Sequence, residues 1–181
     1  MRGAVSRPWL NWTLIALGVV LLAGLVVLLL FDGDDGSPAS GEPQIVSAAQ
    51  LESFAADLGH PVYWLGERPD SRVELTETSA GRVYVRYLDA GAEAGDPEAK
   101  FLTVGTYPVE DGVEALERTH NFEDNRELAA SGEGGVVLID TKAPRNAHLA
   151  YPGDDFQIEI FSPIPGEAIR LASSDRVRPV P

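Results

Sequence analysis

The chain contains no cysteine, which excludes disulfide bridges, cysteine-based zinc sites and attachment to a membrane through a lipidated cysteine. It also has little lysine, since Lys100 and Lys142 are the only two among 14 basic residues. Acidic residues number 28, and the formal net charge is −14. A surface of that sign repels phosphates, so nucleic acid is excluded as a partner. The preference for arginine, with frequent alanine and glycine, is typical of a GC-rich genome and indicates a bacterial origin.

Motifs that carry chemistry are also missing. The histidines His60, His120 and His148 are far apart in sequence, and none has the spacing of a zinc site. No serine lies in a GxSxG or a paired SxxK motif. The glycine-rich residues 132–135 are not followed by the Lys-Ser/Thr pair of a phosphate-binding loop, and we interpret them as a turn. The sequence therefore predicts no catalytic residue, no metal, no cofactor and no identifiable small-molecule ligand.

A long apolar run is the strongest feature that the sequence does have. Residues 14–31 contain no polar or charged side chain. Extended by Trp9, Leu10 and Trp12, the run is long enough to cross a hydrocarbon core of about 30 Å as a helix. We therefore predict a transmembrane helix over residues 9–31, with the lipid bilayer as its partner.

The charges on both sides of this run predict its orientation. Arg2 and Arg7 precede it, whereas three aspartates follow it directly. By the positive-inside rule, residues 1–8 form a cytoplasmic tail and the rest of the chain lies outside the cytoplasm. The alternative is a signal peptide cleaved near Ala39, although the apolar run is longer than such peptides usually have.

Behind the anchor, residues 32–44 have no large apolar side chain and are rich in acidic residues, glycine and proline. This composition predicts an acidic flexible linker. Residues 45–181 are then long enough for one globular domain with its own core.

Periodicity predicts the elements of that domain. Ser47 and Gln50 form a capping box that opens a helix ending at Gly59, and Asp111 with Glu114 predicts a second capping box. A third, short helix is expected near residues 166–173. Alternating or apolar segments predict strands at 61–65, 72–78, 82–88, 101–107, 136–139, 148–151 and 156–161. Short turns between strands predict an α+β domain with a mainly antiparallel sheet and two or three packed helices.

Aromatic residues supply the only candidate binding surface. Tyr63, Trp64 and Tyr84 lie on strands that could be neighbours, and Arg86 follows on the same face as Tyr84. An exposed group of this kind would accept a sugar, a peptide or a partner protein. The alternative is that the aromatic rings pack in the core.

An acidic loop precedes the strand predicted at 101–107. It carries Asp89, Glu93, Asp96 and Glu98, which we interpret as a solvated face, with weak divalent-cation binding as the alternative.

These observations predict a single-pass membrane protein in the cell membrane with a non-catalytic extracytoplasmic domain. Its expected ligand is a protein or another cell-envelope component, because a tether raises the local concentration of a binding module. The alternative is a membrane-anchored extracytoplasmic hydrolase. A histidine within hydrogen-bond reach of a carboxylate or serine in a cleft would favour that alternative.

Overall fold

The computed structural model describes residues 41–122 and 125–181. The predicted cytoplasmic tail (1–8), transmembrane helix (9–31) and most of the predicted linker (32–44) lie outside these residues. Within the described ranges, no helix combines the length and hydropathy that a membrane span requires.

The described chain contains three helices and ten strands. The helices are α2 (Ala48–Leu58), α3 (Gly112–His120) and α4 (Glu167–Ala172). The strands are β1 (Gln44–Val46), β2 (Tyr63–Trp64), β3 (Ser71–Glu77), β4 (Val83–Asp89), β5 (Leu102–Pro108), β6 (Arg126–Ala130), β7 (Val136–Asp140), β8 (Asn146–Ala150), β9 (Phe156–Phe161) and β10 (Arg178–Pro179).

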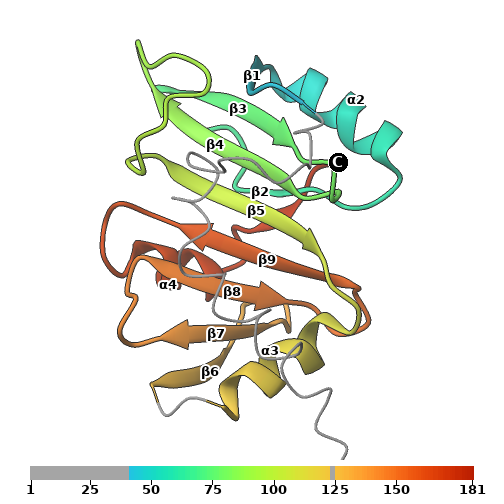
Figure 1. The fold of residues 1–181 in the computed structure, drawn as a ribbon, viewed down its shortest axis with the longest axis vertical. Coiled ribbons are helices and arrows are strands. Elements are labelled where there is room, and N and C mark those ends of the chain that lie inside the picture. The colour runs from blue at the N-terminus through green and yellow to red at the C-terminus, as the bar shows by residue number, and fades with distance from the viewer. Residues whose placement is uncertain (1–40, 123–124) are drawn as a thin grey trace, which may run out of the picture. The chain divides into compact units, whose positions relative to one another are not determined.

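Eight strands form one antiparallel sheet in the order β1-β3-β4-β5-β9-β8-β7-β6 (Figure 1). Strands β3 to β5 and strands β6 to β9 are two consecutive meanders, which meet where β5 pairs with β9. Strands β2 and β10 form a separate antiparallel pair. The predicted α+β class with an antiparallel sheet and packed helices is confirmed for this part of the chain.

Each face of the sheet packs against different helices. Alternation along the strands sends one set of side chains, such as Val85, Val104 and Ile160, into the main core with α2, α4 and β2. The opposite face, here called the α3 face, carries a smaller cluster in which Leu116 of α3 packs on Leu138 and Ala150. Because α3 contacts β6 to β9, it covers only one end of that face.

The first predicted helix start is confirmed. Ser47 caps α2, its hydroxyl accepts the Gln50 backbone N–H at 3.3 Å, and the Gln50 side chain accepts the Ser47 N–H at 2.9 Å. Gly59 ends the helix in the left-handed conformation, as predicted.

The second predicted capping box is wrong. Asp111 has a φ of 50° and its side chain makes no capping bond. Its backbone N–H instead donates to the carboxylate of Asp155, at 3.0 Å. Gly112, the next residue, explains this conformation. A Cβ added there would lie only 2.3 Å from the carbonyl oxygen of Phe156, so only a glycine allows the backbone to come this close. The chain therefore enters α3 through a tight backbone contact with the start of β9.

Strand β6 was not predicted. Its sequence, RELAA, consists of good helix formers and has no β-branched residue. Pairing with β7 over all five residues overrides this local preference. Strands β1 and β10, with three and two residues, were also missed.

Candidate binding surface at the β4–β5 loop

An ion pair on the α3 face lies at the base of the longest described loop. Glu74 on β3 and Arg86 on β4 are direct cross-strand partners. The Glu74 side chain is fully buried, and its Oε1 lies 2.7 Å from Nη1 of Arg86. A buried carboxylate is strongly unfavourable without such a partner. The pair therefore fixes both side chains at this position.

The same two side chains hold the loop between β4 and β5. The backbone N–H of Gly95 donates to the second Glu74 oxygen at 2.6 Å. Arg86 donates through Nη2 to the carbonyl of Asp96 at 2.8 Å, and its guanidinium lies 5.1 Å from the ring centroid of Phe101. One ion pair with a buried carboxylate thus fixes the middle of the loop and the residue before β5.

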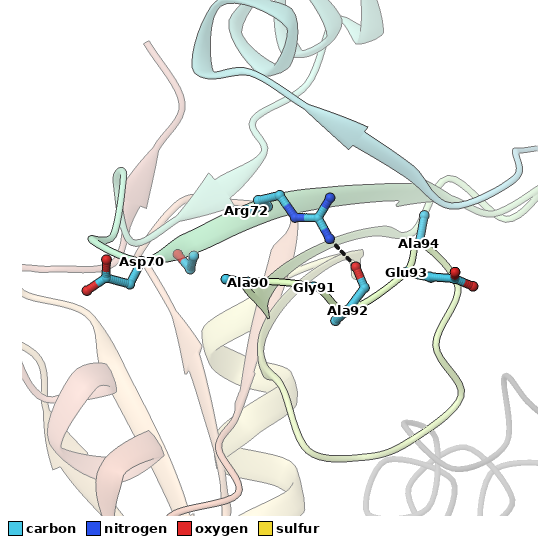
Figure 2. A pocket seen from close by; sticks show the side chains of 8 residues that line it. Asp70, Arg72, Ala90, Gly91, Ala92, Glu93 and Ala94 are labelled. Atoms are coloured by element: carbon cyan, nitrogen blue, oxygen red, sulfur yellow. Dashed lines mark hydrogen bonds between the residues drawn. The ribbon is translucent and has the colours of Figure 1, made fainter.

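The outer part of the loop is held by exposed charges. The Arg72 guanidinium donates to the carbonyl of Ala92 (Figure 2). Lys100 forms ion pairs with Glu98 at 2.8 Å and with Asp96 at 3.1 Å. Hydrogen bonds to Glu98 and Asp96 raise the pKa of Lys100. The pKa of Asp96 is lowered, first by the hydrogen bond from the backbone N–H of Glu98 and second by the hydrogen bond from Lys100. Asp96 and Lys100 are therefore both charged at neutral pH.

Two shallow depressions adjoin the loop. One, of about 780 Å³, is shown in Figure 2, and the second has about 680 Å³. Both share the segment from Gly91 to Ala94. Their charged lining residues are Asp70, Arg72, Asp89, Glu93, Asp96 and Lys100. Acidic side chains outnumber basic ones, so this surface favours a basic or hydrogen-bond-donating partner.

The four residues of the predicted binding surface are distributed over both faces of the sheet. Tyr63 and Trp64 belong to the main core and are each 4% exposed. Tyr84 lies on the α3 face and is 3% exposed. Arg86 is 18% exposed and is the only one of the four that contacts the loop. The structure therefore links Arg86 to the β4–β5 loop and places the three aromatic rings in the interior.

A second polar group lies at the centre of the α3 face. The buried Glu159 carboxylate accepts hydrogen bonds from the Tyr107 hydroxyl and the Asn146 amide, each at 2.7 Å. A Cβ at Gly105 would lie 2.8 Å from the Tyr107 ring, so this glycine lets the tyrosine reach Glu159. Two sequence signals could have revealed the group: a glycine inside a strand, and a glutamate alternating with apolar residues.

His148 is the histidine closest to this group. It is the cross-strand partner of Glu159 and is half-buried. Burial lowers its pKa, against the opposing influence of the Glu159 carboxylate, so the neutral imidazole is favoured. Among the described contacts no hydrogen bond joins His148 to Glu159, whose two carboxylate oxygens accept from Tyr107 and Asn146.

The other two histidines lie elsewhere. His60 stacks on Phe156 with ring centroids 5.0 Å apart, and its Nδ1 lies 3.0 Å from the carbonyl of Pro61. His120 ends α3. Over residues 41–122 and 125–181, no three acidic or histidine side chains come together as metal ligands.

Comparison with protein-family models, with curated proteins and with solved structures finds no match to this chain. Function is therefore inferred from the geometry of the described residues.

Proposed function

We propose that the protein is a membrane-tethered, non-catalytic module that binds a basic segment of a protein, or another cationic cell-envelope component, through its β4–β5 loop. The observation that supports this most directly is the buried Glu74–Arg86 pair, which holds the loop from beneath. A loop of this length is normally mobile, and functional loops are commonly positioned by a rigid scaffold. Ordering the loop in advance removes part of the entropy cost of binding.

The tether belongs to the same proposal. Residues 9–31 would lie in the bilayer with the N-terminus in the cytoplasm, and residues 32–44 would connect them to the extracytoplasmic domain. A flexible connection of this length keeps the loop near the membrane surface, which raises its effective concentration toward other envelope components.

The experiment is capture of the partner by the full-length chain. Membranes are treated with a crosslinker, and proteins joined to the chain are identified by mass spectrometry. Two double variants are compared with the wild type. One removes two exposed carboxylates at the loop (Asp89→Asn with Glu93→Gln), and the other removes two exposed carboxylates from α2 (Asp57→Asn with Glu52→Gln).

We expect one specific envelope protein in the wild type and the α2 variant, and several-fold less of it in the loop variant. Raising the salt concentration should weaken capture, because attraction between exposed charges is screened. Equal capture by both double variants would exclude the β4–β5 loop as the contact surface.

A membrane-anchored extracytoplasmic hydrolase is the second candidate, and His148, the cross-strand partner of Glu159, is the residue that such an enzyme would use. In such an enzyme the neutral imidazole would activate water as a general base. The test is turnover of a panel of fluorogenic esters and glycosides by the full-length chain. Turnover that His148→Gln abolishes would support this candidate, whereas turnover equal to the buffer rate on the whole panel would count against it.

A further inference from the structure

Strand β6 forms one edge of the large sheet, and no described strand continues the sheet beyond it (Figure 1). The two edges differ. At the other end, β1 has three residues and directly follows Pro43. Strand β6 has five residues and no proline; Arg126 and Glu127 at its start are charged, and its last three residues, Leu128 to Ala130, are apolar. Short strands, proline and charged side chains, lysine above all, are the usual means of protecting an edge from pairing. Of the two edges, β6 is therefore the one suited to accept another strand.

The hydrogen bonds to β7 define which backbone groups of β6 face outward. Ser131 N–H donates to the carbonyl of Gly135, and Thr141 N–H donates to the carbonyl of Asn125, both at 2.9 Å. Odd-numbered residues between 125 and 131 thus direct their backbone groups to β7. In an antiparallel strand, the backbone N–H and C=O groups of successive residues point alternately to the two sides. The N–H and C=O groups of Leu128 and Ala130 therefore point away from β7, to the open edge.

The side chains of β6 add an apolar element to this edge. Leu128 lies opposite Leu138, hence on the α3 face, and is 38% exposed.

We infer that the occupant of this edge is the β6 strand of a second copy of the chain. Antiparallel pairing about a two-fold axis at Leu128 uses all five residues of both strands. Leu128 then faces Leu128 of the second copy, and Glu127 faces Ala129. The remaining position, Ala130, faces Arg126, so no two like charges meet. Shifting one strand by two residues would place Glu127 opposite itself.

Such pairing joins the two sheets into one and forms an isologous dimer. The β4–β5 loops are at the far ends of the combined sheet, since β4 and β6 lie on opposite sides of the sheet centre. The inference does not depend on the proposed function, but it would make a binding module bivalent.

Salt distinguishes this occupant from a basic partner strand. Residues 41–181 contain 25 acidic and 12 basic side chains, so two copies repel each other at long range. Ionic strength shortens the screening length from about 10 Å at 0.1 M to about 3 Å at 1 M, so salt should strengthen self-pairing. A basic peptide bound at the same edge would be released instead.

The test uses single-cysteine variants of the full-length chain in detergent, which are clean reporters because the wild type has no cysteine. Opposed residues in an outward-facing pair have Cα atoms about 5.5 Å apart, within the range that a disulfide can bridge. Leu128→Cys should therefore form a covalent dimer under mild oxidation, and more of it at high salt. Ala90→Cys, an exposed loop position, is the control and should remain monomeric.

Two further variants test the backbone contact in the Leu128→Cys background. Ala130→Pro removes an outward N–H without disturbing the hydrogen bonds to β7 and should abolish the crosslink, while Ala130→Ser should preserve it.

If circular dichroism shows that Ala130→Pro does not fold, Leu128→Lys in the cysteine-free chain replaces it. This variant should weaken dimerisation in sedimentation by about fivefold, as two like charges about 5 Å apart repel in water. Crosslinking of Leu128→Cys no faster than Ala90→Cys, or a dimer unaffected by both edge variants, would overturn the inference.

Discussion

At the scale of single residues, the Glu74–Arg86 pair both keeps a buried charge compensated and positions the β4–β5 loop. Glu74 is fully buried, so removing its partner leaves an uncompensated charge in the interior. The pair also supplies three of the contacts that hold the β4–β5 loop. Its loss should therefore affect both stability and the conformation of the loop.

We predict that Arg86→Met lowers the free energy of unfolding by about 3 kcal/mol, as expected when one partner of a buried pair is lost. The double variant Glu74→Leu with Arg86→Met should recover most of this loss, because no buried charge remains. Urea unfolding measures both. Arg170→Met is the matched control: it breaks an ion pair with Glu167 in which the arginine is 73% exposed, and should cost less than about 1 kcal/mol. Equal losses in the two single variants would contradict the assignment.

His148 makes the stability of the domain depend on pH. Burial lowers the pKa of His148 below its ordinary value of 6.5, so the unfolded chain binds a proton more readily than the folded one. The stability that His148 contributes is thus present above pH 6.5 and is lost as the pH falls through its lowered pKa. We expect the free energy of unfolding to decrease between pH 7 and pH 5, and His148→Gln to flatten this dependence.

Chemical denaturation at half-unit pH steps measures the effect. The same slope in His148→Gln and in the wild type would show that other groups cause the pH dependence.

At the scale of elements, α3 is positioned by its first residue rather than by a side-chain cap. Gly112 is buried, and its N–H donates to the carbonyl of Asp154 at 3.2 Å. The carboxamide of Gln157 donates to the Gly112 carbonyl at 3.3 Å. These contacts bring the helix close to β9 and define how α3 covers the sheet end.

We therefore predict that Gly112→Ala destabilises the domain by at least about 1–3 kcal/mol, the usual cost of overpacking, because the new Cβ meets a backbone oxygen that cannot move aside. Thermal unfolding provides the measurement. Gly41→Ala is the control, since a Cβ there would make only an ordinary contact, 3.5 Å from the carbonyl oxygen of Glu77. A melting temperature equal to that of the control would refute the close contact between α3 and β9.

At the scale of the whole molecule, the separation of an apolar N-terminal run from a strongly acidic remainder is the dominant property. After Arg2 and Arg7, the chain has 12 basic and 28 acidic side chains. An acidic domain is repelled from anionic lipid headgroups, so a tether rather than surface attraction would hold it at a membrane.

The corresponding prediction is the topology. In intact cells, a membrane-impermeant maleimide should label Ala90→Cys in the full-length chain, whereas Ala4→Cys should react only after the membrane is permeabilised. The protein should also stay in the membrane fraction at alkaline pH. Recovery of a soluble form that begins near Ala39 would instead identify the apolar run as a cleaved signal peptide.

The sequence alone determined those features that depend on neighbouring residues: the apolar run, the charge of the remainder, the α2 capping box with its glycine end, most strands and hence the α+β class. These are local, because hydrogen bonds and periodicities within a few residues decide them. Only the tertiary structure decided the features that join distant segments. Strand β6 exists because β7 pairs with it, Gly112 replaces a capping box because Phe156 lies against it, and Glu74 orders a loop some twenty residues away because β3 and β4 bring it beneath Gly95. A single sequence has no local signal for such contacts, since their free energy arises from burial that only the assembled sheet provides.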